Sequence, residues 1–133
     1  YFTMVYGVID VRARQLTYTA AGHPGPILIP AKGELKMQNS TGLPVGMLPG
    51  VDFREQTVNL VPGDRLFLYT DGVTEALDDN DEEFGKERLL DALEEGRGST
   101  LRETARDVVN RVHAWQGGGV GFDDLSLLGT EIS

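Results

Sequence analysis

The strongest constraint on the fold is a change in the spacing of apolar residues partway along the chain. From Phe2 to Thr70 they recur at every second position or in short runs, which is the pattern of β-strands. From Gly85 to Trp115 they recur every three to four residues, which is the pattern of amphipathic helices. Strands followed by helices and then by one closing strand predict an α+β fold.

The first part of the chain is expected to form antiparallel sheet. The run from Leu16 to Ala21 places Leu16, Tyr18 and Ala20 on one face, and the polar residues 12–15 before it predict a hairpin with the preceding strand. Further strands are expected at 2–11, 27–29, 35–37, 53–60 and 65–70. The segments 22–26 and 39–50, rich in glycine and proline, are expected to be loops.

Two helices are expected at residues 85–95 and 101–115, and a last strand at 125–128. Thr100 and Glu103 have the spacing of a capping box, which predicts that the second helix begins directly after Thr100. The chain has 133 residues, which suits a single domain, and it contains neither an internal repeat nor a linker.

Charge and composition exclude several classes of function. There are 12 Lys and Arg against 21 Asp and Glu, a formal net charge of −9, which argues against nucleic acid and anionic membrane surfaces as partners. Cysteine is absent, so disulfides, thiolate metal sites and a cysteine nucleophile are excluded. This composition suits a cytoplasmic protein.

The first chemically suggestive motif is Asp71 followed by Gly72, directly after an apolar strand. A rigid strand end fixes the direction of a carboxylate, and a glycine beside it lets a ligand approach the backbone closely. The alternative interpretation is an ordinary Asp-Gly turn, which is common in proteins.

A second motif, Asp123-Asp124, precedes the closing strand. Adjacent acids on extended backbone point in different directions, so one can face a cleft; the alternative is a solvated turn. Together the two motifs offer oxygen ligands only, which suits Mg²⁺ or Mn²⁺. The chain's histidines, His23 and His113, are given no catalytic role, and His23 is expected to make a structural hydrogen bond to backbone.

Five motifs in this order resemble one family. They are Ala21-Gly22-His23-Pro24, Gly42-Leu43-Pro44-Val45-Gly46, Leu68-Tyr69-Thr70-Asp71-Gly72-Val73-Thr74-Glu75-Ala76, Phe84-Gly85-Lys86-Glu87-Arg88-Leu89 and Asp123-Asp124-Leu125-Ser126-Leu127-Leu128. The chain resembles the metal-dependent protein serine/threonine phosphatases (the PPM group), in particular the bacterial branch like the stage II sporulation protein E (SpoIIE) phosphatase.

The resemblance implies a layered β-sandwich with flanking antiparallel helices and a centre of two divalent cations, Mn²⁺ or Mg²⁺. It implies that Asp71 and Asp123 are metal ligands, that Gly72 and Asp124 lie beside the metal, and that no side chain is catalytic beyond the metal-bound water. The implied reaction is hydrolysis of phosphoserine or phosphothreonine on a regulatory protein, such as an anti-sigma-factor antagonist.

The chain departs from the family in lacking the upstream Gly-Asp motif, whose aspartate bridges the two metals. Residues 1–133 are therefore expected to be the C-terminal portion of a single phosphatase domain, with a fold incomplete at the N-terminus and an incomplete second metal site. We expect this portion to be weak or inactive alone and to self-associate through exposed strand edges.

Two other interpretations stay open. The first is a non-catalytic binding or regulatory module that retains the phosphatase fold, although retention of Asp71 and Asp123 argues against it. The second is a cation-binding domain built on the acidic run 78–83, which lacks the glycine and terminal glutamate of an EF-hand loop.

Overall fold

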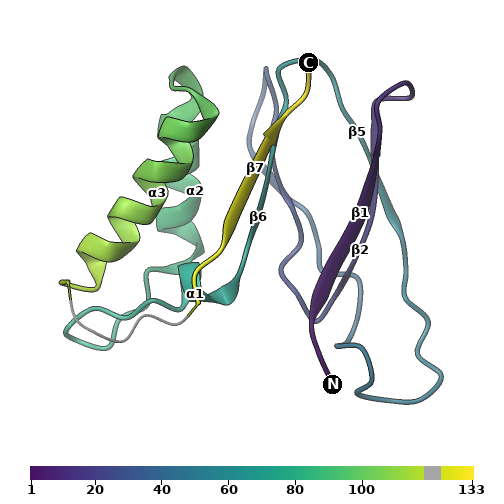
Figure 1. Cartoon of the computed structure of the whole chain (residues 1–133), viewed down its shortest axis with the longest axis horizontal. Coiled ribbons are helices and arrows are strands. Elements are labelled where there is room, and N and C mark those ends of the chain that lie inside the picture. Colours follow the sequence, from purple (N-terminus) through teal and green to yellow (C-terminus); the bar gives the residue numbers. More distant parts are fainter. Residues whose placement is uncertain (119–123) are drawn as a thin grey trace. The chain divides into compact units, whose positions relative to one another are not determined.

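The computed structural model describes residues 1–118 and 124–133, and these form two compact units. The first unit comprises Tyr1–Leu66 and Glu131–Ser133, and the second comprises the described part of Phe67–Thr130. The elements, labelled in Figure 1, are β1 (Met4–Asp10), β2 (Gln15–Ala21), β3 (Ile27–Ile29), β4 (Lys36–Met37), β5 (Gln56–Asn59), β6 (Arg65–Tyr69), α1 (Asp71–Thr74), α2 (Gly85–Glu95), the 3₁₀ turn η1 (Gly96–Gly98), α3 (Leu101–Trp115) and β7 (Leu127–Glu131). Antiparallel strands combined with helices confirm the predicted α+β class.

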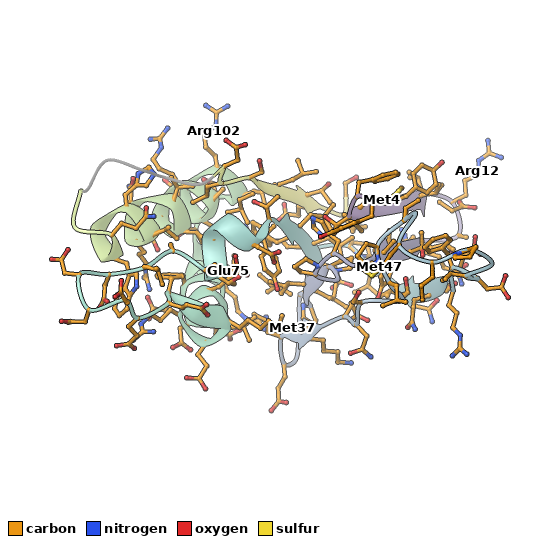
Figure 2. All side chains as sticks on the ribbon, turned by 90° about the horizontal axis from the view of Figure 1, so that it is seen from below. Met4, Arg12, Met37, Met47, Glu75 and Arg102 are labelled. Carbon is orange, nitrogen blue, oxygen red and sulfur yellow. The ribbon has the colours of Figure 1, made fainter. Side chains whose placement is uncertain are left out.

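The first unit is built on a three-stranded antiparallel sheet with the strand order β1-β2-β5. β1 and β2 form the expected hairpin, in which Gly7 lies opposite Tyr18. One carboxylate oxygen of Asp10 closes the turn by accepting hydrogen bonds from the backbone N–H groups of Arg12 (2.9 Å) and Ala13 (2.8 Å). Figure 2 shows Arg12 projecting away from this turn.

The core of the first unit lies on the face of β2 that the alternation predicts. Its buried cluster comprises Leu16, Tyr18, Ala20, Leu28, Leu60 and Leu66. Tyr18 donates its hydroxyl proton to the Asn39 carbonyl at 2.9 Å, and the Thr41 N–H donates to the Ala20 carbonyl at 2.9 Å. The loop around residue 41 therefore bonds to the end of β2, while β5 pairs only with Gln15–Tyr18. The strand expected at 53–60 is accordingly shortened to β5.

A buried aspartate organises the entry to β6. Asp64 is only 3% exposed, and its two carboxylate oxygens accept hydrogen bonds from the N–H groups of Ala31 and Val61, each at 2.8 Å. Its carbonyl accepts a hydrogen bond from the Ile132 N–H, also at 2.8 Å. Amide donors thus compensate the burial of this carboxylate and join three separate parts of the first unit.

The second unit contains both predicted long helices with the predicted bounds. Their buried faces carry Leu89 and Leu93 on α2 and Val108 and Val112 on α3, all with no exposed surface. The capping box is confirmed: the Glu103 N–H donates to the Thr100 hydroxyl at 3.1 Å, and the Thr100 N–H donates to the Glu103 carboxylate at 2.9 Å. These hydrogen bonds lower the pKa of Glu103. No helix in the described ranges is long and apolar enough to cross a membrane.

Trp115 at the end of α3 contacts Phe84 and Arg88 at the start of α2, and we call these three side chains the aromatic clasp. The Arg88 guanidinium lies 3.9 Å from the centre of the Trp115 ring and donates to the Phe84 carbonyl at 3.0 Å. The Trp115 indole N–H donates to the Glu82 carbonyl at 2.9 Å, and the rings of Phe84 and Trp115 meet edge to face. The clasp therefore anchors the acidic run 78–83 to α3.

The clasp predicts that Trp115→Ala lowers the free energy of unfolding by about 2–3 kcal/mol, because it removes ring packing, the cation–π contact and an indole hydrogen bond. Urea unfolding followed by circular dichroism measures this loss. Trp115→Phe keeps an aromatic ring and should lose less. Equal unfolding midpoints for Trp115→Ala and the wild type would show that the clasp does not contribute to stability.

Candidate functional site

The candidate site begins where β6 ends. The strand is buried at Leu66, Phe67 and Tyr69, so its end has a fixed position. Thr70 is still extended (φ −95°, ψ 160°), and α1 begins at Asp71. The Asp71 side chain is exposed, and its carboxylate makes no hydrogen bond or ion pair with any other described residue. The structure thus places at a rigid strand end an exposed carboxylate that pairs with none of residues 1–118 and 124–133.

Thr70 connects this strand end to the segment that follows the second acidic motif. Its backbone N–H donates to the Ser126 carbonyl at 3.1 Å, and its hydroxyl accepts the Ser126 N–H at 2.9 Å. The same hydroxyl lies 3.4 Å from the carbonyl oxygens of Asp124 and Ser126. Residues 124–126 therefore run directly beside the turn that carries Asp71.

Gly72 is where the two segments approach most closely. A Cβ atom added to Gly72 would lie 2.4 Å from the carbonyl oxygen of Asp124, well inside van der Waals contact. The space that a side chain would fill at Gly72 is thus taken by the backbone of Asp124, and not by a ligand as expected from the sequence. Gly72 and Asp124, predicted as neighbours of one site, do lie together. Asp123, the second predicted ligand, lies outside the described residues.

Tyr69 adds a polar group that sequence reasoning did not single out. Its ring is 2% exposed, and its hydroxyl has no hydrogen-bond partner among the described residues. Burial raises the pKa of this hydroxyl, and the negative charge of Asp71 raises it further. The hydroxyl therefore keeps its proton at neutral pH, within the electrostatic reach of Asp71.

Other polar residues considered in the sequence analysis, such as His23 and Asp78, lie within hydrogen-bond distance of nearby backbone groups. The His23 ring nitrogen Nδ1 lies 2.9 Å from the Pro24 carbonyl, which matches the expected structural role, and His113 is exposed on α3. Asp78 accepts the N–H groups of Asn80 and Glu82 and closes a turn in the acidic run. Within residues 1–118 and 124–133, no three acidic or histidine side chains are placed to hold a metal ion.

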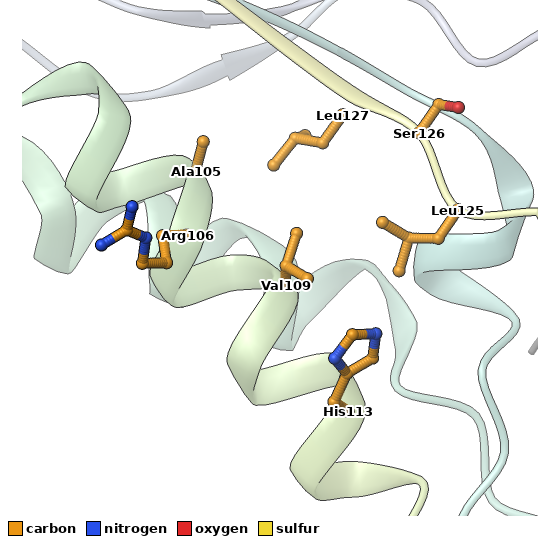
Figure 3. A pocket seen from close by; sticks show the side chains of 7 residues that line it. All are labelled: Ala105, Arg106, Val109, His113, Leu125, Ser126 and Leu127. Carbon is orange, nitrogen blue, oxygen red and sulfur yellow. The ribbon is translucent and has the colours of Figure 1, made fainter.

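A groove of about 640 Å³ lies between α3 and the segment after Asp124 (Figure 3). It is lined by Ala105, Arg106, Val109, His113, Leu125, Ser126 and Leu127. Sequence patterns do not indicate this groove, because it forms only where α3 packs beside residues 125–127. Glu75, labelled in Figure 2, directly follows α1 in the same unit, and its N–H donates to the Asp71 carbonyl at 2.8 Å.

Comparison with known proteins gives a family match over the whole chain. The family model described as stage II sporulation protein E (SpoIIE) matches residues 1–133. Protein IcfG of Synechocystis is 32% identical over 126 residues, which cover 95% of this chain and 20% of that protein. Phosphoserine phosphatase RsbU of Bacillus subtilis is 28% identical over 129 residues, 96% of this chain and 38% of RsbU. The chain thus spans well under half the length of these relatives.

Solved structures share the fold. The SiaA-PP2C domain of Pseudomonas aeruginosa matches with a TM-score of 0.86 at 24% identity, over 98% of this chain and 52% of that chain. RsbX in complex with magnesium matches with a TM-score of 0.68 at 18% identity, over 98% of this chain and 56% of that chain. These likenesses confirm the predicted phosphatase-like fold and agree with a chain that represents part of such a domain.

The close approach predicts that Gly72→Ala lowers the free energy of unfolding by about 1–3 kcal/mol, because the new methyl group would overlap the Asp124 carbonyl. Gly98→Ala is the matched control, since a Cβ there meets no atom within 4 Å. Urea unfolding should show a loss for Gly72→Ala and a change within about 0.5 kcal/mol for Gly98→Ala. Equal stabilities of the two variants would contradict the described contact.

Proposed function

The chain belongs to the SpoIIE family, and on this basis we propose that the protein containing it uses divalent cations to hydrolyse phosphoserine or phosphothreonine on a regulatory protein. The observation that carries the proposal is the pairing of Thr70 with residues 124–126. This pairing holds the acidic strand end beside Asp124, the residue that follows Asp123 in the sequence.

The residues present fit part of a metal centre. The Asp71 carboxylate is exposed and unpaired among the described residues, and hard cations prefer carboxylate oxygens. We propose Asp71 and Asp123 as ligands, with Gly72 and Asp124 beside the metal and no catalytic side chain beyond the metal-bound water. When bound, Mn²⁺ or Mg²⁺ would lower the pKa of a coordinated water and neutralise charge on the phosphoryl oxygens.

The proposal also states which portion of the catalytic domain residues 1–133 represent. The chain covers about half of the SiaA-PP2C chain, whose fold it shares. We propose that residues 1–133 are the C-terminal portion of one phosphatase domain and that residues upstream complete the second metal site. Two carboxylates alone hold Mg²⁺ or Mn²⁺ weakly, because these ions need near-ideal geometry to give up their waters. The isolated portion would then be weak or inactive.

The substrate class follows from the relatives. RsbU is named as a phosphoserine phosphatase, and a phosphorylated anti-sigma-factor antagonist is the regulatory protein that we propose as substrate. The net charge of −9 argues against nucleic acid and anionic membrane surfaces as partners. The absence of cysteine suits the cytoplasmic location that we propose with this substrate.

The proposal predicts that the full-length protein dephosphorylates a phosphoserine substrate in the presence of Mn²⁺ and that EDTA stops it. Asp71→Asn should slow turnover by about 100-fold or more, because losing a ligand costs at least as much as losing a partner of a ligand. Asp91→Asn, at an exposed acid on α2, is the control and should change turnover little. Phosphate release measures the rates.

Two results would overturn parts of this proposal. Phosphate release that persists in EDTA, or that survives Asp71→Asn unchanged, would remove the metal-dependent function. Turnover by residues 1–133 alone at the rate of the full-length protein would show that this portion is already complete.

We also propose that the isolated chain associates with a second copy through β1. This strand lies at the edge of its sheet, and Tyr6 and Val8 on it are 62% and 55% exposed. No other described strand pairs with the outer edge of β1. Such an edge, carrying apolar side chains and no lysine or arginine, favours pairing with another strand. An antiparallel pair of β1 strands would satisfy the free backbone groups of both copies.

Size-exclusion chromatography with light scattering should show dimers or larger species of the isolated chain. Val8→Lys should shift it to the monomer, because a charge on the edge strand opposes pairing. Val61→Lys introduces the same charge at another exposed valine and should leave the association unchanged. A monomeric wild-type chain at high concentration would contradict self-association.

A further inference from the structure

The groove beside α3 has an open strand edge next to it, and we propose that it binds an extended, acidic segment of a partner protein. β7 is the last strand in the order β4-β3-β6-β7, so none of the other described strands pairs with its outer edge. The groove lies between α3 and residues 125–127, at the start of this strand, and belongs to the second unit (Figure 3). The bound segment would add a strand beside β7 and place side chains against α3.

The backbone of β7 directs half of its polar groups away from β6. Just before the strand, the Ser126 carbonyl accepts the Thr70 N–H. Just after it, the Ile132 N–H donates to the Asp64 carbonyl. The backbone groups of successive residues alternate in direction along an antiparallel strand, so the even-numbered residues between these two bonds face β6. The N–H and C=O groups of the odd-numbered residues, beginning with Leu127, therefore point to the outer edge, where an added strand can bond to them.

The side chains that line the groove between these two elements are mostly apolar. Ala105 and Val109 lie about one turn apart on α3, and Leu125 and Leu127 lie across from them. Figure 3 shows the side chains of Val109, Leu125 and Leu127 turned toward one another. In a strand added beside β7, every second side chain would point to this side of the sheet. The lining therefore favours aliphatic residues at alternate positions of the bound segment.

Arg106 gives the groove a positive charge that its own helix does not neutralise. The neighbouring acids of α3 have other partners: Glu103 accepts the Thr100 N–H at 2.9 Å, and Asp107 pairs with Arg111 at 2.8 Å. Within the part of the chain that the structure describes, the Arg106 side chain makes no hydrogen bond or ion pair. In a chain with a net charge of −9, this exposed guanidinium favours a carboxylate on the bound segment.

These features together define the chemistry of the partner. The strand edge requires an extended backbone with N–H and C=O groups to share, the lining requires aliphatic side chains on one face, and Arg106 requires an acid on that same face. A helix would not satisfy the first requirement, because its backbone groups are bonded within the helix. Binding of this kind needs no cation and no catalytic residue.

The experiment measures binding of a fluorescent probe peptide to the full-length protein by fluorescence anisotropy. The probe has about ten residues, the length of a long strand, and threonine alternates in it with valine or glutamate, so that valine and glutamate share one face. It should bind saturably, with or without EDTA. The same peptide with methyl groups on its backbone nitrogens keeps every side chain but loses its N–H donors, and it should bind about tenfold more weakly or worse.

A charge reversal tests the role of Arg106. Arg106→Glu should weaken binding of the glutamate probe about fivefold or more, because an attraction becomes a repulsion. The same variant should bind a probe with lysine in place of glutamate more tightly than the wild type does. These opposite responses distinguish a change of specificity from a loss of folding, which would weaken both probes. Arg12→Glu makes the same charge change at an exposed arginine of the first unit and is the matched control.

Three results would overturn the proposal. No binding of the glutamate probe by the full-length protein would show that the groove does not take such a segment. If the protein also formed dimers that Arg106→Glu disrupts, the occupant would be a second copy instead. Equal binding of the methylated and unmethylated probes would exclude strand addition to β7. Equal effects of Arg106→Glu and Arg12→Glu would exclude a specific contact with Arg106.

Discussion

The contact between Gly72 and the carbonyl of Asp124 is the constraint on which the candidate site depends. The two backbones meet there with no space for a side chain, and the bonds of Thr70 hold them in register. An acid at a strand end is common in proteins and has no function by itself. It becomes a candidate metal ligand here because Asp124, an acid far away in sequence, has its backbone held beside Gly72 and Thr70.

Much of the fold could be predicted from local patterns, because its elements have strong local signals. The alternation in β2 gave the correct buried face, and the capping box gave the correct start of α3. The shortened β5 could not be predicted, because a strand needs a partner along its whole length. Beyond Tyr18, the partner of β2 is the loop around Thr41 rather than residues 53–55, and nothing in either segment alone indicates this competition.

The candidate site likewise combines features that the local sequence predicts with features that depend on tertiary contacts. The exposed position of Asp71 at the end of a buried strand follows from the neighbouring sequence, and the structure agrees. The neighbouring sequence does not predict that the Thr70 hydroxyl bonds to Ser126 instead of capping α1. A threonine directly before an acidic helix start usually caps that helix. The burial of the Tyr69 hydroxyl without a hydrogen-bond partner among the described residues, and the groove beside α3, likewise depend on tertiary contacts.

The hydrogen bonds that Ile132 makes with Gly63 and Asp64 also have a consequence for the order of folding. The first unit takes its last members from Glu131–Ser133, so the whole second unit is inserted within it along the sequence. Closing such a long loop carries an entropic cost, which falls if the inserted helices are already compact. During synthesis on a ribosome, the first unit can therefore be completed only after residues 131–133 emerge, although most of its chain is made earlier.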